Sequence, residues 1–76
     1  MKIHHYKAIY KDYFVAAFPM QDWATQYQMR TWCRELYGKP GYNAEIGEVR
    51  WVDEIEYGEV RIKHQHDLVM FLLRWE

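Results

Sequence analysis

The stretch that most constrains the fold is Met20 to Tyr37, which contains no glycine and no internal proline. Such a stretch predicts a helix, because these two residues are the least favourable in a helix interior. Pro19 suits a first helical turn, Gly38 suits the position just after a helix end, and Pro40 follows where a helix cannot continue. A chain of 76 residues is long enough for only one domain, so we expect residues 1–76 to form a single domain.

The segment before this helix is strand-like. Residues 3–10 and 13–18 are rich in aromatic and β-branched side chains, which favour strands. Lys11 and Asp12 separate them, either as a bend between two strands or as a bulge in one long strand. The sequence therefore predicts one strand or two over residues 3–18.

The segment after the helix predicts a β-hairpin. In residues 49–56, the apolar Val49, Trp51 and Ile55 share one parity, and Arg50, Glu54 and Glu56 share the other, which is broken only by Val52. In residues 59–63, Val60 and Ile62 alternate with Arg61 and Lys63. A period of two residues is typical of an antiparallel pair with one face buried and one face wet. Tyr57 and Gly58 are the expected turn, because Gly58 can adopt a positive φ.

The last segment predicts a second helix that begins near Gln65 to Asp67. Asp67 would lie in its first turn, where the helix dipole favours a negative charge. The stripe expected to face the sheet consists of Leu68, Phe71, Leu72 and Trp75. Val69 and Leu73 lie about 100° to 140° further round, so the apolar sector is wider than that of an ordinary surface helix. This extra width would pack on the first helix, or be covered by another copy of the chain or a partner.

The element order is therefore β-α-β-β-α, which predicts the α+β class. We expect an antiparallel sheet of three strands, or four if residues 3–18 divide, with both helices on one face. This resembles a ferredoxin-like fold that lacks its last strand. A missing strand leaves a sheet edge open for pairing. Together with Val69 and Leu73, this edge predicts a homo-oligomer, most simply a homodimer, or a protein partner.

Composition and charge exclude several classes of function. The formal net charge of −1 gives no general attraction to nucleic acid or to anionic lipid. The longest apolar run, Leu68 to Leu73, is far shorter than the roughly 20 residues of a membrane span. Cys33 is the only cysteine, so no disulfide can form within the chain, and Met1-Lys2 begins no signal peptide. These features predict a cytoplasmic protein with no membrane contact.

One face of the first helix is a candidate binding surface. Its members are Trp23, Tyr27, Arg30 and Arg34, which lie within about 60° of one another on a helical wheel. Aromatic and arginine side chains together can stack nucleobases or bind an acidic partner. The alternative is ordinary surface packing, in which the arginine stems cover the rings. The opposite face, with Met29, Cys33 and Leu36, is expected to enter the core.

Four histidines near strand ends are weak candidates for metal ligands: His4, His5, His64 and His66. If the first and last strands pair antiparallel, His4 or His5 would lie close to His64, and histidine is a common zinc ligand. The default is that these are exposed histidines, so we predict no metal and no cofactor.

We also predict that the chain is not an enzyme and has no catalytic residues. Cys33 lies on the apolar face of its helix, which favours a buried thiol over a nucleophile. Acidic residues surround the hairpin at Glu45, Glu48, Asp53, Glu54, Glu56 and Glu59. Because they alternate with Arg50, Arg61 and Lys63, cross-strand charge pairs explain them without acid–base chemistry.

Two stretches together resemble a known group of proteins. Residues 32–38, WCRELYG, are similar to a WCxExFG pattern, and residues 67–75, DLVMFLLRW, are similar to DAxxFxLRW. The group consists of small uncharacterised proteins of tailed phages of aquatic bacteria. The chain departs from its pattern at Tyr37, where Phe is expected, and at Leu68, where a small residue is expected. The resemblance implies a phage or marine-metagenome origin and the cytoplasm of an infected bacterium, and it implies no activity.

Overall fold

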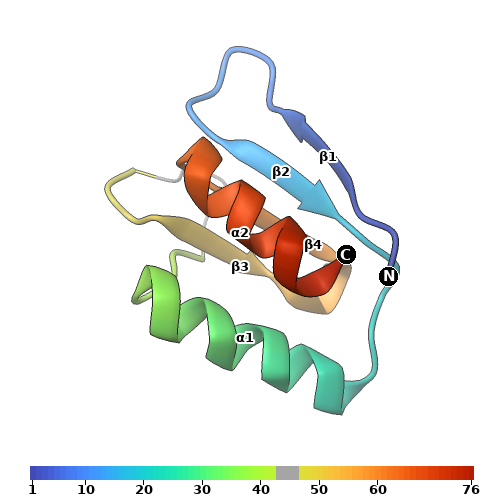
Figure 1. The fold of residues 1–76 in the computed structure, drawn as a ribbon. Coiled ribbons are helices and arrows are strands. Elements are labelled where there is room, and N and C mark those ends of the chain that lie inside the picture. Colours follow the sequence, from blue (N-terminus) through green and yellow to red (C-terminus); the bar gives the residue numbers. More distant parts are fainter. Residues whose placement is uncertain (43–46) are drawn as a thin grey trace.

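The computed structural model describes residues 1–42 and 47–76. The strands are β1 (His4–Lys7), β2 (Phe14–Ala17), β3 (Trp51–Glu54) and β4 (Glu59–Ile62), and the helices are α1 (Trp23–Tyr37), the short 3-10 helix η1 (Ile55–Tyr57) and α2 (Gln65–Trp75). The four strands form one antiparallel sheet in the order β1-β2-β4-β3. Both long helices lie on the same face of this sheet (Figure 1). The predicted α+β class is confirmed.

The N-terminal segment forms two strands. His4 pairs with Ala17 and Lys7 with Phe14, so β1 and β2 make a hairpin. Strand β1 therefore occupies the position beside β2, so the open edge of the described sheet lies at β1 and not at β2. The unit from β2 to α2 follows the predicted β-α-β-β-α order. The additional strand, β1, comes before this unit in the chain and not after it. The ferredoxin-like strand order itself is therefore not confirmed.

Helix α1 begins later than its sequence predicts. Asp22 caps its N-terminus, where the carboxylate accepts a hydrogen bond of 2.8 Å from the backbone N–H of Thr25. Hydrogen bonds from the side chain and backbone of Thr25 hold the pKa of Asp22 below its ordinary value. Pro19 consequently lies outside the helix and not in its first turn. At the other end, Gly38 has a φ of 88° and donates its N–H to the Arg34 carbonyl, as a helix cap does.

The main core lies between the sheet and the two helices. Its largest fully buried side chains are Trp51, Phe71, Met29, Ile55 and Ile62. Trp32 of α1 contacts two rings of α2 edge-on, at 6.2 Å from Phe71 and 6.1 Å from Trp75 between ring centres. Full burial of a large apolar side chain stabilises a fold by roughly 1.5–3 kcal/mol. The predicted inward stripe of α2 is thus confirmed, with Leu72 only partly buried.

A second, smaller cluster covers the other face of the sheet. It contains Tyr13, Val15 and Val52, and the guanidinium of Arg61 lies 5.6 Å from the centre of the Tyr13 ring. Val52 interrupts the alternation of its strand because it is buried on this second face. The outer edge of β3 is also occupied, since Gly41 exchanges backbone hydrogen bonds with Trp51 and Asp53. Strand β1 is therefore the exposed edge of the described sheet.

A buried ion pair fixes the start of α2. The Arg50 guanidinium donates two hydrogen bonds to the carboxylate of Asp67, at 3.1 and 2.9 Å. The Asp67 side chain is only 3% exposed, whereas the Arg50 side chain is 46% exposed. Asp67 also accepts a buried hydrogen bond of 2.6 Å at its carbonyl from the Tyr37 hydroxyl. These bonds tie the end of α1, the start of β3 and the start of α2 together.

The turn between β3 and β4 requires glycine. Gly58 has a φ of 78°, in the left-handed region, as its sequence position predicts. A side chain there would also collide with the carbonyl oxygen of Phe18. The β3–β4 hairpin and the segment leading to α1 can approach each other only because this position has no Cβ.

The two ends of the described chain meet at one corner of the sheet (Figure 1). The amino group of Met1 lies 3.4 Å from the backbone oxygen of Glu76. The carboxylate of Glu76 also accepts a hydrogen bond of 3.1 Å from the backbone N–H of Ile3. These contacts hold β1 against the end of α2.

Candidate interaction surface

The candidate aromatic and arginine face of α1 divides into two parts. Trp23 and Tyr27 lie one turn apart, with their rings stacked at 5.8 Å and an interplanar angle of 6°. They are 77% and 59% exposed. Stacking lets the two rings cover part of each other, but most of their apolar surface still contacts water. This pair is a ready contact surface for another aromatic or apolar group.

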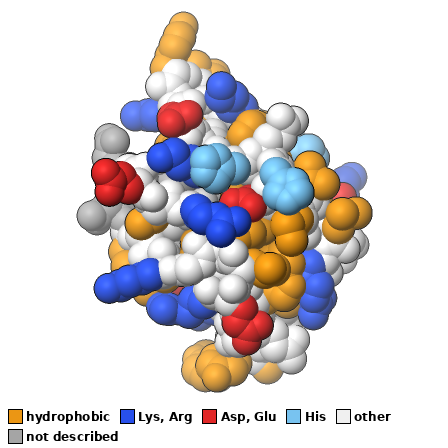
Figure 2. Space-filling model, turned by 60° about the vertical axis from the view of Figure 1, so that its left-hand side comes forward, with side chains coloured by type: hydrophobic (Ala, Val, Ile, Leu, Met, Phe, Trp, Pro, Cys, Tyr) orange, Lys and Arg blue, Asp and Glu red, His pale blue; other side chains and the backbone are white. Residues whose placement is uncertain are grey.

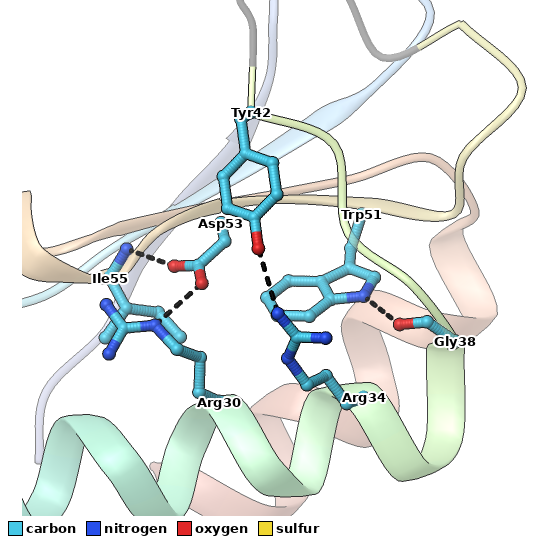
Figure 3. Close-up of polar contacts among 7 residues, drawn as sticks. All are labelled: Arg30, Arg34, Gly38, Tyr42, Trp51, Asp53 and Ile55. Carbon is cyan, nitrogen blue, oxygen red and sulfur yellow. Dashed lines mark hydrogen bonds and ion pairs between the residues drawn. The ribbon is translucent and has the colours of Figure 1, made fainter.

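The two arginines of this face bind other parts of the same chain (Figure 3). Arg30 forms an ion pair with Asp53 of β3 at 2.7 Å, and the Asp53 side chain is only 5% exposed. Arg34 donates a hydrogen bond of 2.9 Å to the hydroxyl of Tyr42. The structure therefore places the guanidinium groups toward β3 and the loop that follows α1, and not between the two stacked rings.

Helix α2 presents the two apolar residues expected on its outer side. Leu73 is 82% exposed and Val69, one turn earlier, is 47% exposed. The first helix does not cover them, which excludes the first of the three ways of burying the wide apolar sector. On the face seen in Figure 2, hydrophobic side chains gather beside histidines, with charged side chains around them.

A shallow groove lies between the two helices. Its volume is about 290 Å³, and it is lined by Tyr27, Gln28, Thr31, Trp32, Glu35 and Arg74. The guanidinium of Arg74 lies 4.1 Å from the centre of the Trp75 ring, on which it stacks. We call the groove, together with Trp23, Val69 and Leu73, the helix-layer surface. Sequence patterns did not indicate the groove, because they give the faces of each helix but not the side on which two helices meet.

The structure does not bring the four histidines together. His4 lies opposite Ala17, which pairs with Glu59 at the start of β4, whereas His64 follows the far end of β4. Strand β2 lies between β1 and β4, so the N-terminal histidines and His64 lie at opposite ends of the sheet. His66 lies in the first turn of α2. Within residues 1–42 and 47–76, no group of three or more histidine, cysteine or acidic side chains could hold a metal ion.

Cys33 and the acidic residues occupy structural positions. Cys33 is fully buried, and burial, followed by the nearby charge of Asp53, raises the pKa of its thiol far above the ordinary value. The side chain therefore stays protonated, which is unfavourable for a nucleophile. Of the acidic residues around the hairpin, Asp53 pairs with Arg30 of α1, and Glu59 pairs with Arg61 of its own strand. Glu54 lies opposite Glu59, so the expected pairing of opposite charges across the strands was wrong at this position. Glu45 lies outside the described residues.

Comparisons with known proteins give no relative. No protein-family profile, no curated protein and no solved structure matches the chain. In the described part of the chain, no helix has the length and apolar character needed to cross a bilayer. The case for a function therefore depends on the surfaces described above.

Proposed function

We propose that the chain is a non-enzymatic binding and assembly module that forms a homodimer through its helix-layer surface. The observation that carries this proposal is the exposure of Leu73 at 82% on a helix whose opposite side is core. Val69 lies on the same side of α2, and Tyr27 and the stacked Trp23 extend the surface across the groove. Small monomers expose large apolar side chains singly, whereas a row of them marks a contact with another protein.

Its amino-acid content also supports a protein contact. Tryptophan, tyrosine and methionine are enriched at protein interfaces, and lysine and glutamate are depleted there. The helix-layer surface presents the aromatic rings of Trp23, Tyr27 and Trp32 and the aliphatic side chains of Val69 and Leu73, and its groove contains one arginine and one glutamate. The resemblance to small phage proteins suggests that this module acts in the cytoplasm of an infected bacterium.

Sedimentation of the purified protein over a wide concentration range tests the proposal. We expect the wild type to be a dimer and Leu73→Glu to be a monomer that keeps the fold. The matched control is Ile9→Glu, since Ile9 is a similarly exposed aliphatic side chain, at 79%, in the loop between β1 and β2. This control should remain a dimer. A wild type that stays monomeric at high concentration would overturn the proposal.

A second candidate is a regulator that binds nucleic acid or a host protein with the aromatic part of the face Trp23, Tyr27, Arg30 and Arg34. The stacked, exposed rings of Trp23 and Tyr27 support it, because nucleobases stack on such rings. The engagement of Arg30 by Asp53 weakens it, since that charge is already neutralised. Titration with a single-stranded oligonucleotide should quench tryptophan fluorescence in the wild type and not in Trp23→Ala; no quenching in either would remove this candidate.

A further inference from the structure

The groove between α1 and α2 contains two opposite charges without ionic partners. Glu35 extends from the α1 wall and Arg74 from the α2 wall. Neither forms an ion pair with any other residue in the described part of the chain. Arg74 is held over the Trp75 ring at 4.1 Å, which restricts the conformations of its side chain. The groove therefore presents one fixed cation and one anion to whatever covers it.

We propose that a second copy of the chain covers this groove, with Arg74 of each copy bound to Glu35 of the other. This inference rests on the proposed homodimer and specifies its geometry. In a dimer with two-fold symmetry, a contact of residue i with residue j is repeated as a contact of j with i. A groove that contains one arginine and one glutamate is therefore complementary to itself, and both ion pairs form at once.

The charge of the groove favours this occupant over a partner of different chemistry. Its two charges sum to zero, so it does not attract a strongly acidic or basic chain over distance. The half-buried ring of Trp32 and the more exposed ring of Tyr27 both line the groove. In this interface the apolar side chains supply most of the affinity, and the two ion pairs fix the alignment of the copies.

A charge-swap series tests the pairing in the intact protein. Arg74→Glu alone and Glu35→Arg alone each replace two attractive contacts by two repulsive ones, and we expect the dimer dissociation constant to rise about tenfold or more. The double variant restores opposite charges across the interface and should return close to the wild-type constant. The control is the double variant Lys11→Glu with Asp12→Arg, which swaps two exposed charges in the loop between β1 and β2 and should leave the constant unchanged.

Thermal unfolding of each variant separates loss of the fold from loss of the dimer. If the wild type is a dimer and the single variants leave its dissociation constant unchanged, the pairing of Arg74 with Glu35 is wrong and the proposed function stands. The same holds if the double variant dissociates as readily as the single variants. A monomeric wild type would overturn both proposals.

Discussion

Replacement of Arg50 by methionine should destabilise the fold strongly, because it removes the cation from a carboxylate that water cannot reach. The Asp67 side chain is 3% exposed and accepts two hydrogen bonds from Arg50. Loss of one partner from a fully buried ion pair costs about 3–5 kcal/mol. Since the Arg50 side chain is 46% exposed and therefore partly hydrated, we expect the lower end of that range, about 3 kcal/mol.

Replacement of the other partner, Asp67, should reduce the free energy of unfolding by less. Asp67→Asn removes the buried negative charge but leaves an amide oxygen that still accepts a hydrogen bond from Arg50. The half-exposed guanidinium can also bind water, so we expect a loss of about 1–2 kcal/mol. In the double variant, no buried charge remains, although the neutral amide at position 67 has lost the hydrogen bonds from Arg50. Its cost should therefore fall below the sum of the single costs by about 1–2 kcal/mol.

Urea unfolding followed by tryptophan fluorescence measures these differences. The series belongs in the Leu73→Glu background, so that assembly does not add to the measured stability. A domain of 76 residues has a free energy of unfolding of about 4–11 kcal/mol. The Arg50 variant should therefore lose about 2 M or more in its urea midpoint. A loss below about 0.5 kcal/mol, or strictly additive costs, would refute the reasoning.

Two further predictions concern buried polar groups. Trp51→Phe should lose more stability than Trp75→Phe when compared by urea unfolding, because the Trp51 indole N–H donates a 2.8 Å hydrogen bond to Gly38, whereas that of Trp75 is buried and has no partner among the described residues; equal losses would contradict this. Burial raises the pKa of Cys33 and of Tyr37 above their ordinary values of 9.0 and 10.0, so the stability that they contribute is complete below about pH 9 and falls as the pH rises further. The unfolding midpoint should drop between about pH 9 and pH 11, and Cys33→Ala should reduce that drop; an unchanged midpoint in the wild type would contradict the assignment.

Periodicity in the sequence was sufficient for the elements and for most of the core. The inward stripe of α2 and the position of Gly58 followed from spacing and backbone chemistry alone. The end of α1 was less well predicted: Leu36 is 38% exposed, whereas Tyr37 is buried because its hydroxyl reaches the carbonyl of Asp67. A contact between residues thirty positions apart does not affect the local sequence pattern. A helical wheel of α1 alone therefore could not show whether Leu36 or Tyr37 enters the core.

The candidate site was predictable only one helix at a time. The exposure of Val69 and Leu73 follows from the width of the apolar sector of α2, and the shared face of Trp23 and Tyr27 follows from their spacing of four residues on α1. The binding of Arg30 by Asp53 could not be foreseen, because it depends on the side of α1 that faces β3. The position of β1 was equally hidden, since strand order is set by packing across the whole sheet and not by residue type.

The contact between the amino group of Met1 and the backbone of Glu76 makes the described fold nearly a closed loop. A peptide link across that corner would need little added length, so a cyclic version of the chain is geometrically accessible. Proteins attached at either end would emerge side by side. If they are bulky, they would compete for the same space next to the first strand.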